Sequence, residues 1–139
     1  MIKEDYVSFE TAKLLKEKGF IGSGDIGSRC GFYSEKDYET GHGIITKTGR
    51  EVGLVYDDLD NSELECYEYL RPTLQMAMKW LREVHNIDIC VFPEHYDYIL
   101  WGYNCRIYKN KEQFCHSENF KFYEEACEVG IKYCLENLI

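Results

Sequence analysis

The segment that most constrains the fold is residues 98–108, which read YILWGYNCRIY. Aromatic and β-branched side chains predominate in it, and these are enriched in strands because they pack well on a pleated, half-buried surface. A shorter strand is predicted nearby, over residues 112–117. The two runs together indicate neighbouring strands.

A third strand is predicted just upstream, over residues 87–92. Its side chains alternate in character, as expected for a period of two. One face carries Ile87, Ile89 and Val91. Pro93 is expected to break the run, because proline lacks the N–H that a strand ladder uses. Glu94 and His95 are expected to form the turn that follows.

Two helical patterns flank these strands. The first covers residues 73–85, with Pro72 placed where a missing N–H costs little. Its apolar stripe has helical spacing and consists of Leu74, Ala77, Met78, Leu81 and Val84. Trp80 is expected at the edge of this stripe.

The second pattern covers residues 123–137, where Glu124 and Glu125 complement the positive end of the helix dipole. Its buried face is expected to comprise Ala126, Cys127, Gly130, Ile131, Cys134 and Leu138. The order helix, three strands, helix, with short connections, predicts an antiparallel meander covered by helices on one face.

The N-terminal part is predicted to begin with a helix over residues 9–18, capped by Ser8 and ended by Gly19. Phe9, Ala12 and Leu15 fall on one face of this helix, with Leu14 beside them. A glycine-rich small β region then fills residues 20–70. Its short strands are expected at residues 29–33, 43–47 and 51–56, the last two joined by a turn at Thr48 and Gly49. No Pro- or Ser-rich linker is visible, so residues 1–139 are predicted to form a single α+β domain.

The charge balance bears on partners. The formal net charge is −9, from 25 acidic and 16 basic residues. Such a chain repels phosphate backbones, so no nucleic-acid partner is expected. The charge is compatible with a basic partner, but the better interpretation is that it keeps a small protein soluble. The double-stranded-RNA-binding domain has a similar order of elements but carries bases at the start of its last helix, where this chain has Glu124 and Glu125.

Localisation is predicted from what the sequence lacks. The first residues contain acids and no apolar run, and no stretch approaches the roughly 18 apolar residues of a membrane helix. A cytoplasmic protein without a membrane partner is therefore expected. In that reducing compartment the seven cysteines are expected to stay reduced, and several of them lie in apolar patterns, where free cysteine behaves as a small hydrophobe.

Motifs for nucleotide or calcium binding occur in the wrong context. Residues 22–27 match G-x-G-x-x-G, but a helix precedes them and a strand follows, the inverse of a dinucleotide site. The acidic run that starts at Asp58 has Glu63 where a calcium loop needs glycine and Tyr69 where it needs glutamate. No cofactor and no metal site are predicted.

Cysteine and histidine leave one enzymatic alternative open. No C-x-x-C pair is present to hold zinc. Cys105 and Cys115 are expected to face each other across neighbouring strands, with His116 pointing to the other face. A nucleophilic cysteine would need a histidine brought close by the fold, and the histidines weighed for this role are His42, His85 and His95. Catalytic residues are not assigned.

Aromatic side chains suggest a binding surface. The group is Tyr96, Tyr98, Trp101, Tyr103 and Tyr108, and the candidate interaction residues are Trp101, Tyr103 and Tyr108. Alternation places Trp101, Tyr103 and Cys105 on one side of their strand. Aromatic residues are common in interface hot spots, and they also form cross-strand pairs that cover a sheet.

Three segments resemble a family of small uncharacterised proteins from gut Bacteroides and their phages or prophages. They are residues 6–15 (YVSFETAKLL), 72–83 (PTLQMAMKWLRE) and 123–128 (YEEACE). The resemblance implies a bacterial cytoplasm and a phage-linked accessory role.

The sequence is compatible with three functions. The leading hypothesis is a non-enzymatic accessory protein that binds another protein of the host or phage. The alternatives are a small cysteine- or carboxylate-based enzyme and a self-associating structural protein. The last would form a homodimer through the edge of the meander or its aromatic face.

Overall fold

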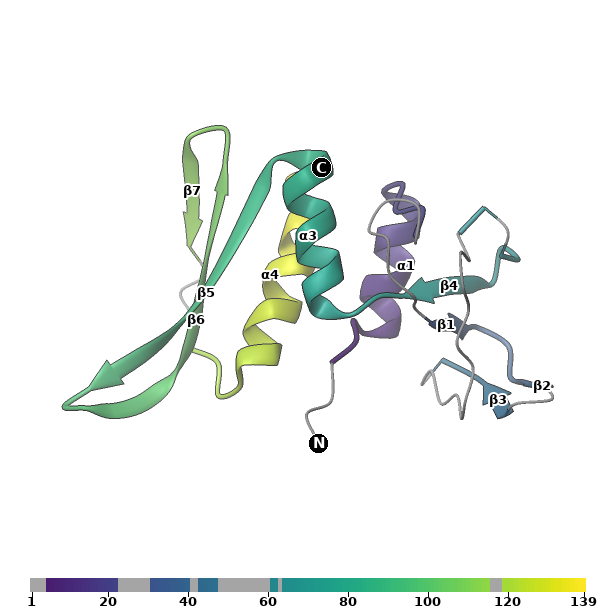
Figure 1. Ribbon diagram of the computed structural model, residues 1–139, viewed down its shortest axis with the longest axis horizontal. Coiled ribbons are helices and arrows are strands. Elements are labelled where there is room, and N and C mark those ends of the chain that lie inside the picture. The colour runs from purple at the N-terminus through teal and green to yellow at the C-terminus, as the bar shows by residue number, and fades with distance from the viewer. Residues whose placement is uncertain (1–4, 23–30, 41–42, 48–60, 63, 116–118) are drawn as a thin grey trace. The chain divides into compact units, whose positions relative to one another are not determined.

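The computed structural model describes residues 5–22, 31–40, 43–47, 61–62, 64–115 and 119–139, and Figure 1 labels their helices and strands. Helices and antiparallel strands confirm the α+β class. The chain divides into an N-terminal unit, Met1–Ala77, and a C-terminal unit, Met78–Ile139, and each is described by itself. The single domain over residues 1–139 stays a prediction.

Helix α1 of the N-terminal unit spans Phe9–Glu17, as predicted within one residue. The Ser8 hydroxyl accepts a hydrogen bond from the Thr11 N–H at 3.2 Å, which satisfies a free donor of the first turn. Gly19 ends the helical region with φ +94°, a conformation that other residues rarely adopt. The buried side chains are Thr11, Ala12 and Leu15.

The described residues of the N-terminal unit form two short antiparallel strand pairs. Strand β1 (Gly31–Ser34) pairs with β4 (Glu68–Arg71), and β2 (Tyr38–Thr40) pairs with β3 (Gly43–Ile45). Strands β1 and β3 overlap the predicted strands, whereas β2 and β4 were not predicted. The strand expected at residues 51–56 and the turn at Thr48 and Gly49 lie outside the described residues.

Helix α3 spans Leu74–His85, again close to its predicted bounds. Leu74, Ala77, Met78 and Leu81 are buried as expected. Trp80, expected to pack at the edge of the stripe, is buried with 2% exposure. The expected burial of Val84 was wrong, since this residue is 54% exposed. Val84 lies in the last turn of α3. Helical periodicity shows which side chains share a face, but it does not show how far along the helix other parts of the protein cover that face.

The C-terminal unit is an antiparallel meander with strand order β5-β6-β7 (Figure 1). The strands are β5 (Ile87–Tyr96), β6 (Ile99–Lys109) and β7 (Glu112–Cys115). Helix α4 (Tyr123–Asn137) lies against β5 and β6 and buries Ala126, Cys127, Gly130, Ile131, Cys134 and Leu135. Leu138, expected on the buried face, is only half-buried because it caps the end of the helix.

Pro93 does not break β5, and this prediction was wrong. The Tyr103 N–H donates to the Phe120 carbonyl at 2.7 Å, and the Phe120 N–H donates to the Tyr103 carbonyl at 2.8 Å. The backbone groups of Tyr103 therefore point away from β5. Pro93, which lies opposite Tyr103, occupies a position without ladder bonds on an edge strand, where its missing N–H costs nothing. The turn accordingly falls at Asp97 and Tyr98 instead of at Glu94 and His95.

Candidate functional site: the tip of the β5–β6 hairpin

The far end of the β5–β6 hairpin, residues 94–102, is called the hairpin tip here. Tyr96 and Ile99 form the last cross-strand pair, so the turn consists of Asp97 and Tyr98 alone. Both have positive φ, +48° and +65°, as a type I′ turn requires. Asp tolerates this conformation, whereas a tyrosine with its Cβ costs about 1 kcal/mol there.

A β-bulge lies next to this turn. Glu94 pairs with Gly102 and His95 pairs with Leu100, so Trp101 is an extra residue with none opposite it on β5. A bulge bends its strand and redirects the side chain of the extra residue. Trp101 is accordingly 67% exposed, although simple alternation would place it on the same side as buried Cys105.

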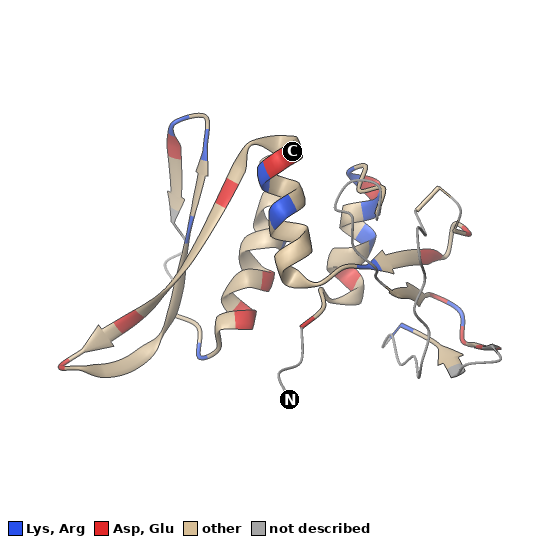
Figure 2. Ribbon diagram, in the orientation of Figure 1, with Lys and Arg blue, Asp and Glu red and all other residues tan. Residues whose placement is uncertain are grey.

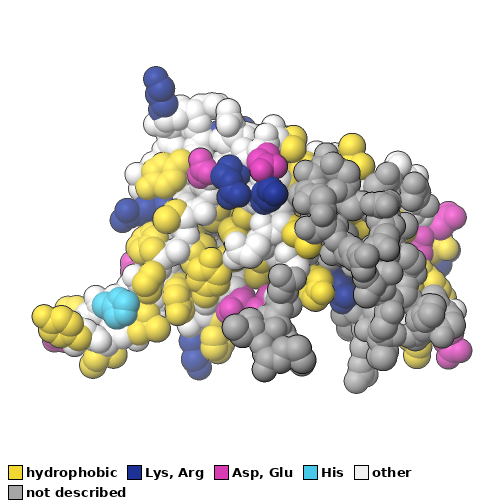
Figure 3. Space-filling model, viewed as in Figure 1, with side chains coloured by type: hydrophobic (Ala, Val, Ile, Leu, Met, Phe, Trp, Pro, Cys, Tyr) yellow, Lys and Arg dark blue, Asp and Glu magenta, His cyan; other side chains and the backbone are white. Residues whose placement is uncertain are grey.

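The hairpin tip exposes a group of large apolar side chains. Its members are Tyr96, Tyr98, Ile99, Leu100 and Trp101. The Tyr98 ring makes least contact with the protein, since its residue exposure is 102%. Figure 3 shows hydrophobic side chains gathered over this end of the hairpin. The rings of Tyr96 and Trp101 meet edge to face, with centroids 6.1 Å apart. Glu94, His95, Tyr96 and Trp101 line an open pocket beside these rings.

The charge of the hairpin tip is negative. Residues 93–105 include Glu94 and Asp97 but neither Lys nor Arg (Figure 2). The Asn104 side-chain amide donates to Glu94 Oε1 at 3.1 Å and so orients that carboxylate. Asp97 is exposed in the turn. The apolar group therefore has an acidic border.

The structure separates the three candidate interaction residues. Trp101 lies with the exposed group of the hairpin tip. Tyr103 is half-buried, and its ring meets that of Tyr123 on α4 edge to face at 5.8 Å. Tyr108 alternates with buried Ile107 near the other end of β6, so it faces away from α4. Ile99 and Leu100 were not among the predicted interaction residues. A turn predicted at Asp97 and Tyr98, instead of at Glu94 and His95, would have placed both residues at the end of the hairpin.

The cysteines whose burial the structure describes fall into two classes. Cys66 and Cys90 are exposed, whereas Cys105, Cys127 and Cys134 are buried. Burial raises the pKa of Cys127 to about 11 and that of Cys134 to about 12, which keeps both as neutral thiols at physiological pH. Neutral thiols are poor nucleophiles and poor metal ligands.

Other cysteine predictions are corrected or lie outside the described residues. Cys115 pairs with Arg106 and not with Cys105, because the β6–β7 turn shifts the register by one residue from the one expected. Within the described part of the chain, no group of three or more His, Cys, Asp or Glu residues is arranged to hold a metal ion. Two of the histidines considered above, His42 and His116, lie outside that part. The same holds for residues 23–27 of the G-x-G-x-x-G match and for residues 58–60 of the acidic run.

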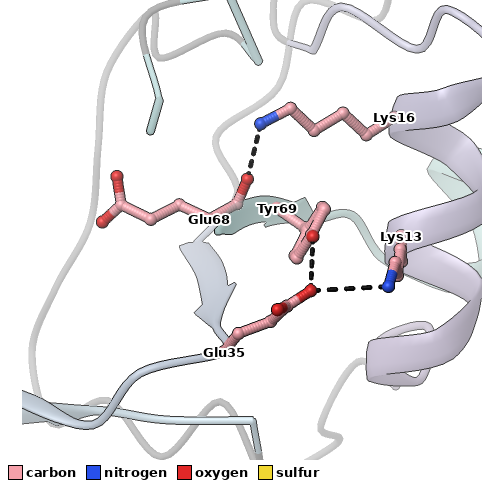
Figure 4. A network of polar contacts seen from close by, with 5 residues as sticks. All are labelled: Lys13, Lys16, Glu35, Glu68 and Tyr69. Carbon is pink, nitrogen blue, oxygen red and sulfur yellow. Dashed lines mark hydrogen bonds and ion pairs between the residues drawn. The ribbon is translucent and has the colours of Figure 1, made fainter. Parts of the chain in front are cut away.

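A polar network in the N-terminal unit is the other candidate (Figure 4). The Tyr69 hydroxyl donates to Glu35 Oε1 at 2.6 Å, and Lys13 Nζ lies 3.5 Å from the same oxygen. The hydrogen bond from Tyr69 and then the charge of Lys13 hold the pKa of Glu35 below its usual value. Burial, followed by the contact with Glu35, raises the pKa of Tyr69 to about 12.

Lys16 on α1 and Glu68 on β4 extend this network. Lys16 Nζ donates to the backbone carbonyl of Glu68 at 2.8 Å (Figure 4). It also donates to the backbone carbonyl of Glu65 at 3.0 Å. The buried Glu68 carboxylate accepts hydrogen bonds from the Tyr38 hydroxyl and from the Glu65 N–H. These bonds satisfy a charge that would otherwise be costly to bury. The network therefore links α1 to β1 and β4, which is a structural role.

Comparisons with protein-family models, curated proteins and solved structures find no match to this chain. Among the described residues, no helix is both long and apolar enough to span a membrane.

Proposed function

We propose that this chain is a non-enzymatic protein-binding module, a phage- or prophage-linked accessory protein of the bacterial cytoplasm. The hairpin tip is its contact surface. The observation that carries the proposal is the exposure of five large apolar side chains within residues 96–101. Contiguous apolar groups on a protein surface are typical of interaction sites, and Trp and Tyr are the commonest hot-spot residues. The phage link is supported by the resemblance of residues 6–15, 72–83 and 123–128.

Local backbone conformation supports the same surface. Tyr98 has φ +65° at a turn position where glycine is the preferred residue. The bulge at Trp101 and the positive φ of Gly102 then turn a second large ring outward. Strain that gives no packing benefit to the folded chain is typical of functional positions. Both features present aromatic rings to a partner.

The test compares tip variants with a matched control. The purified protein is immobilised and exposed to lysate of a Bacteroides host, and bound proteins are identified and quantified by mass spectrometry. Trp101→Ser and Tyr98→Gly should each remove a stoichiometric partner that the wild type retains. Tyr108→Ser, which alters another exposed tyrosine of β6 outside the tip, should leave it bound.

Three results would count against this function. A partner that is lost only with Tyr108→Ser would place the contact surface elsewhere. The absence of any stoichiometric partner would remove the support for a binding module. A concentration-dependent dimer in light scattering, abolished by Trp101→Ser, would favour the self-associating alternative.

A further inference from the structure

We infer that the hairpin tip docks into a protein groove whose floor is apolar and whose rim carries Lys or Arg side chains. This inference rests on the proposed function and adds the chemistry of the partner. Its basis is the arrangement of charge around the exposed group: two carboxylates, Glu94 and Asp97, lie beside it.

The two carboxylates are available to a partner. Neither forms an ion pair within the described part of the chain, and the single hydrogen bond to Glu94 comes from the neutral amide of Asn104. Arg106 is the Lys or Arg residue nearest to the tip in sequence, and its guanidinium lies 4.7 Å from the centre of the Phe92 ring. The tip therefore keeps its negative charge when it approaches another surface.

The positions of the charges suit a rim contact. Asp97 lies in the turn beside Tyr98, and Glu94 lies at the bulge beside Trp101, so one carboxylate flanks each end of the apolar group. A groove that receives the rings would bring its border close to both carboxylates. Cations there accelerate association, and an acidic border would be rejected by like charge.

The same charges disfavour the other candidate occupants. A second copy would bring its own Glu94 and Asp97 to the contact, and each chain carries a net charge of −9. Anionic lipid would also be repelled, since membrane-binding surfaces combine apolar side chains with Lys and Arg. A cationic protein groove avoids both penalties.

The experiment selects partners from a defined probe. A yeast-displayed library of small helical-bundle domains with randomised surface grooves is sorted for binding to the full-length protein and against its Tyr98→Gly variant. Binders are sequenced, and their affinities are measured at low and high salt. Lys and Arg should exceed Asp and Glu at the randomised positions of the binders that need Tyr98.

A charge variant provides the second readout. Glu94→Gln combined with Asp97→Asn should weaken these binders about fivefold at low salt, as expected for two rim ion pairs. Asp88→Asn combined with Glu112→Gln, which changes the net charge equally at exposed positions outside the tip, should leave affinity within about twofold.

The outcomes separate the inference from the proposed function. Binders that need Tyr98 but show no excess of Lys and Arg would overturn the cationic rim and leave protein binding intact. A failure to find any binder that needs Tyr98 would overturn both. Phosphatidylcholine vesicles provide the membrane arm: a blue shift of Trp101 emission that Trp101→Phe removes would overturn the inference in favour of a lipid surface.

Discussion

Gly102 lies directly against Asn119. A Cβ atom at Gly102 would stand 2.2 Å from Asn119 Oδ1 and 2.5 Å from the carbonyl oxygen of Phe120. That carbonyl accepts the N–H of Tyr103, so it has little freedom to move. The close approach holds the segment before α4 against the base of the hairpin tip, and it explains why β6 has a glycine beside the bulge at Trp101.

Replacing Gly102 should therefore destabilise the protein. Gly102→Ala combines a steric clash with a φ of +152°, and we expect a loss of about 2–4 kcal/mol in the free energy of unfolding, measured by urea denaturation. Gly19→Ala is the control, because φ is +94° there but no atom lies within 4 Å of the new Cβ. It should cost only about 1 kcal/mol. Equal losses in the two variants would contradict the role of Asn119 and Phe120.

Tyr98→Gly should stabilise the protein even though it removes a large side chain. The ring is fully exposed, and glycine adopts φ +65° without strain, so we expect a gain of about 0.5–1 kcal/mol in thermal or urea unfolding. Lys111→Gly is the matched variant, at φ +68° in the β6–β7 turn, and it should give a similar gain. If Tyr98→Gly lost stability while Lys111→Gly gained it, the Tyr98 ring would contribute to the stability of the fold. The positive φ of Tyr98 would then no longer support a binding role.

Alkylation should distinguish the exposed thiols from the buried ones. Iodoacetamide under native conditions should modify Cys66 and Cys90, while Cys105, Cys127 and Cys134 react only after unfolding. Peptide mass spectrometry assigns each site, and a sample in denaturant provides full labelling. Native modification of Cys127 as fast as that of Cys90 would mean that the thiol is accessible, and it would revive the cysteine-enzyme alternative.

Alkaline pH should lower stability. The pKa values of Cys127 and Cys134 rise from a usual 9.0 to about 11 and 12 in the folded protein. A raised folded pKa contributes stability that is complete below about pH 9 and is lost as pH rises through the folded pKa, because the unfolded chain releases its thiol protons first.

The slope of this loss can be measured with one variant. Urea midpoints between about pH 9 and pH 11 should fall, with each buried thiol contributing up to about 1.4 kcal/mol per pH unit. Cys134→Ala removes one such group and should reduce the slope, even though it lowers stability at neutral pH. An unchanged slope would mean that other groups, such as Tyr69 with its pKa of about 12, dominate the alkaline transition.

Periodicity and capping explain most of the elements that were predicted from the sequence. The three predicted helices lie within one residue of their expected bounds in the described part of the chain, because Ser8, Pro72 and Glu124 carry local signals that act within one turn. Strand β4 was missed for the opposite reason. Its buried Glu68 is tolerated only because of the bonds from Tyr38 and Glu65, which the surrounding fold supplies.

The sequence by itself determined the α+β class, the helices and the meander, since these follow from side-chain spacing along a short stretch of chain. The tertiary structure alone decided the strand register. The pairing of Pro93 with Tyr103 and the extra residue at Trp101 depend on how β6 meets both β5 and Phe120. A shift of one residue in a strand moves side chains to the other face. For that reason the register, and not the composition of residues 98–108, determined which aromatic side chains reach the surface.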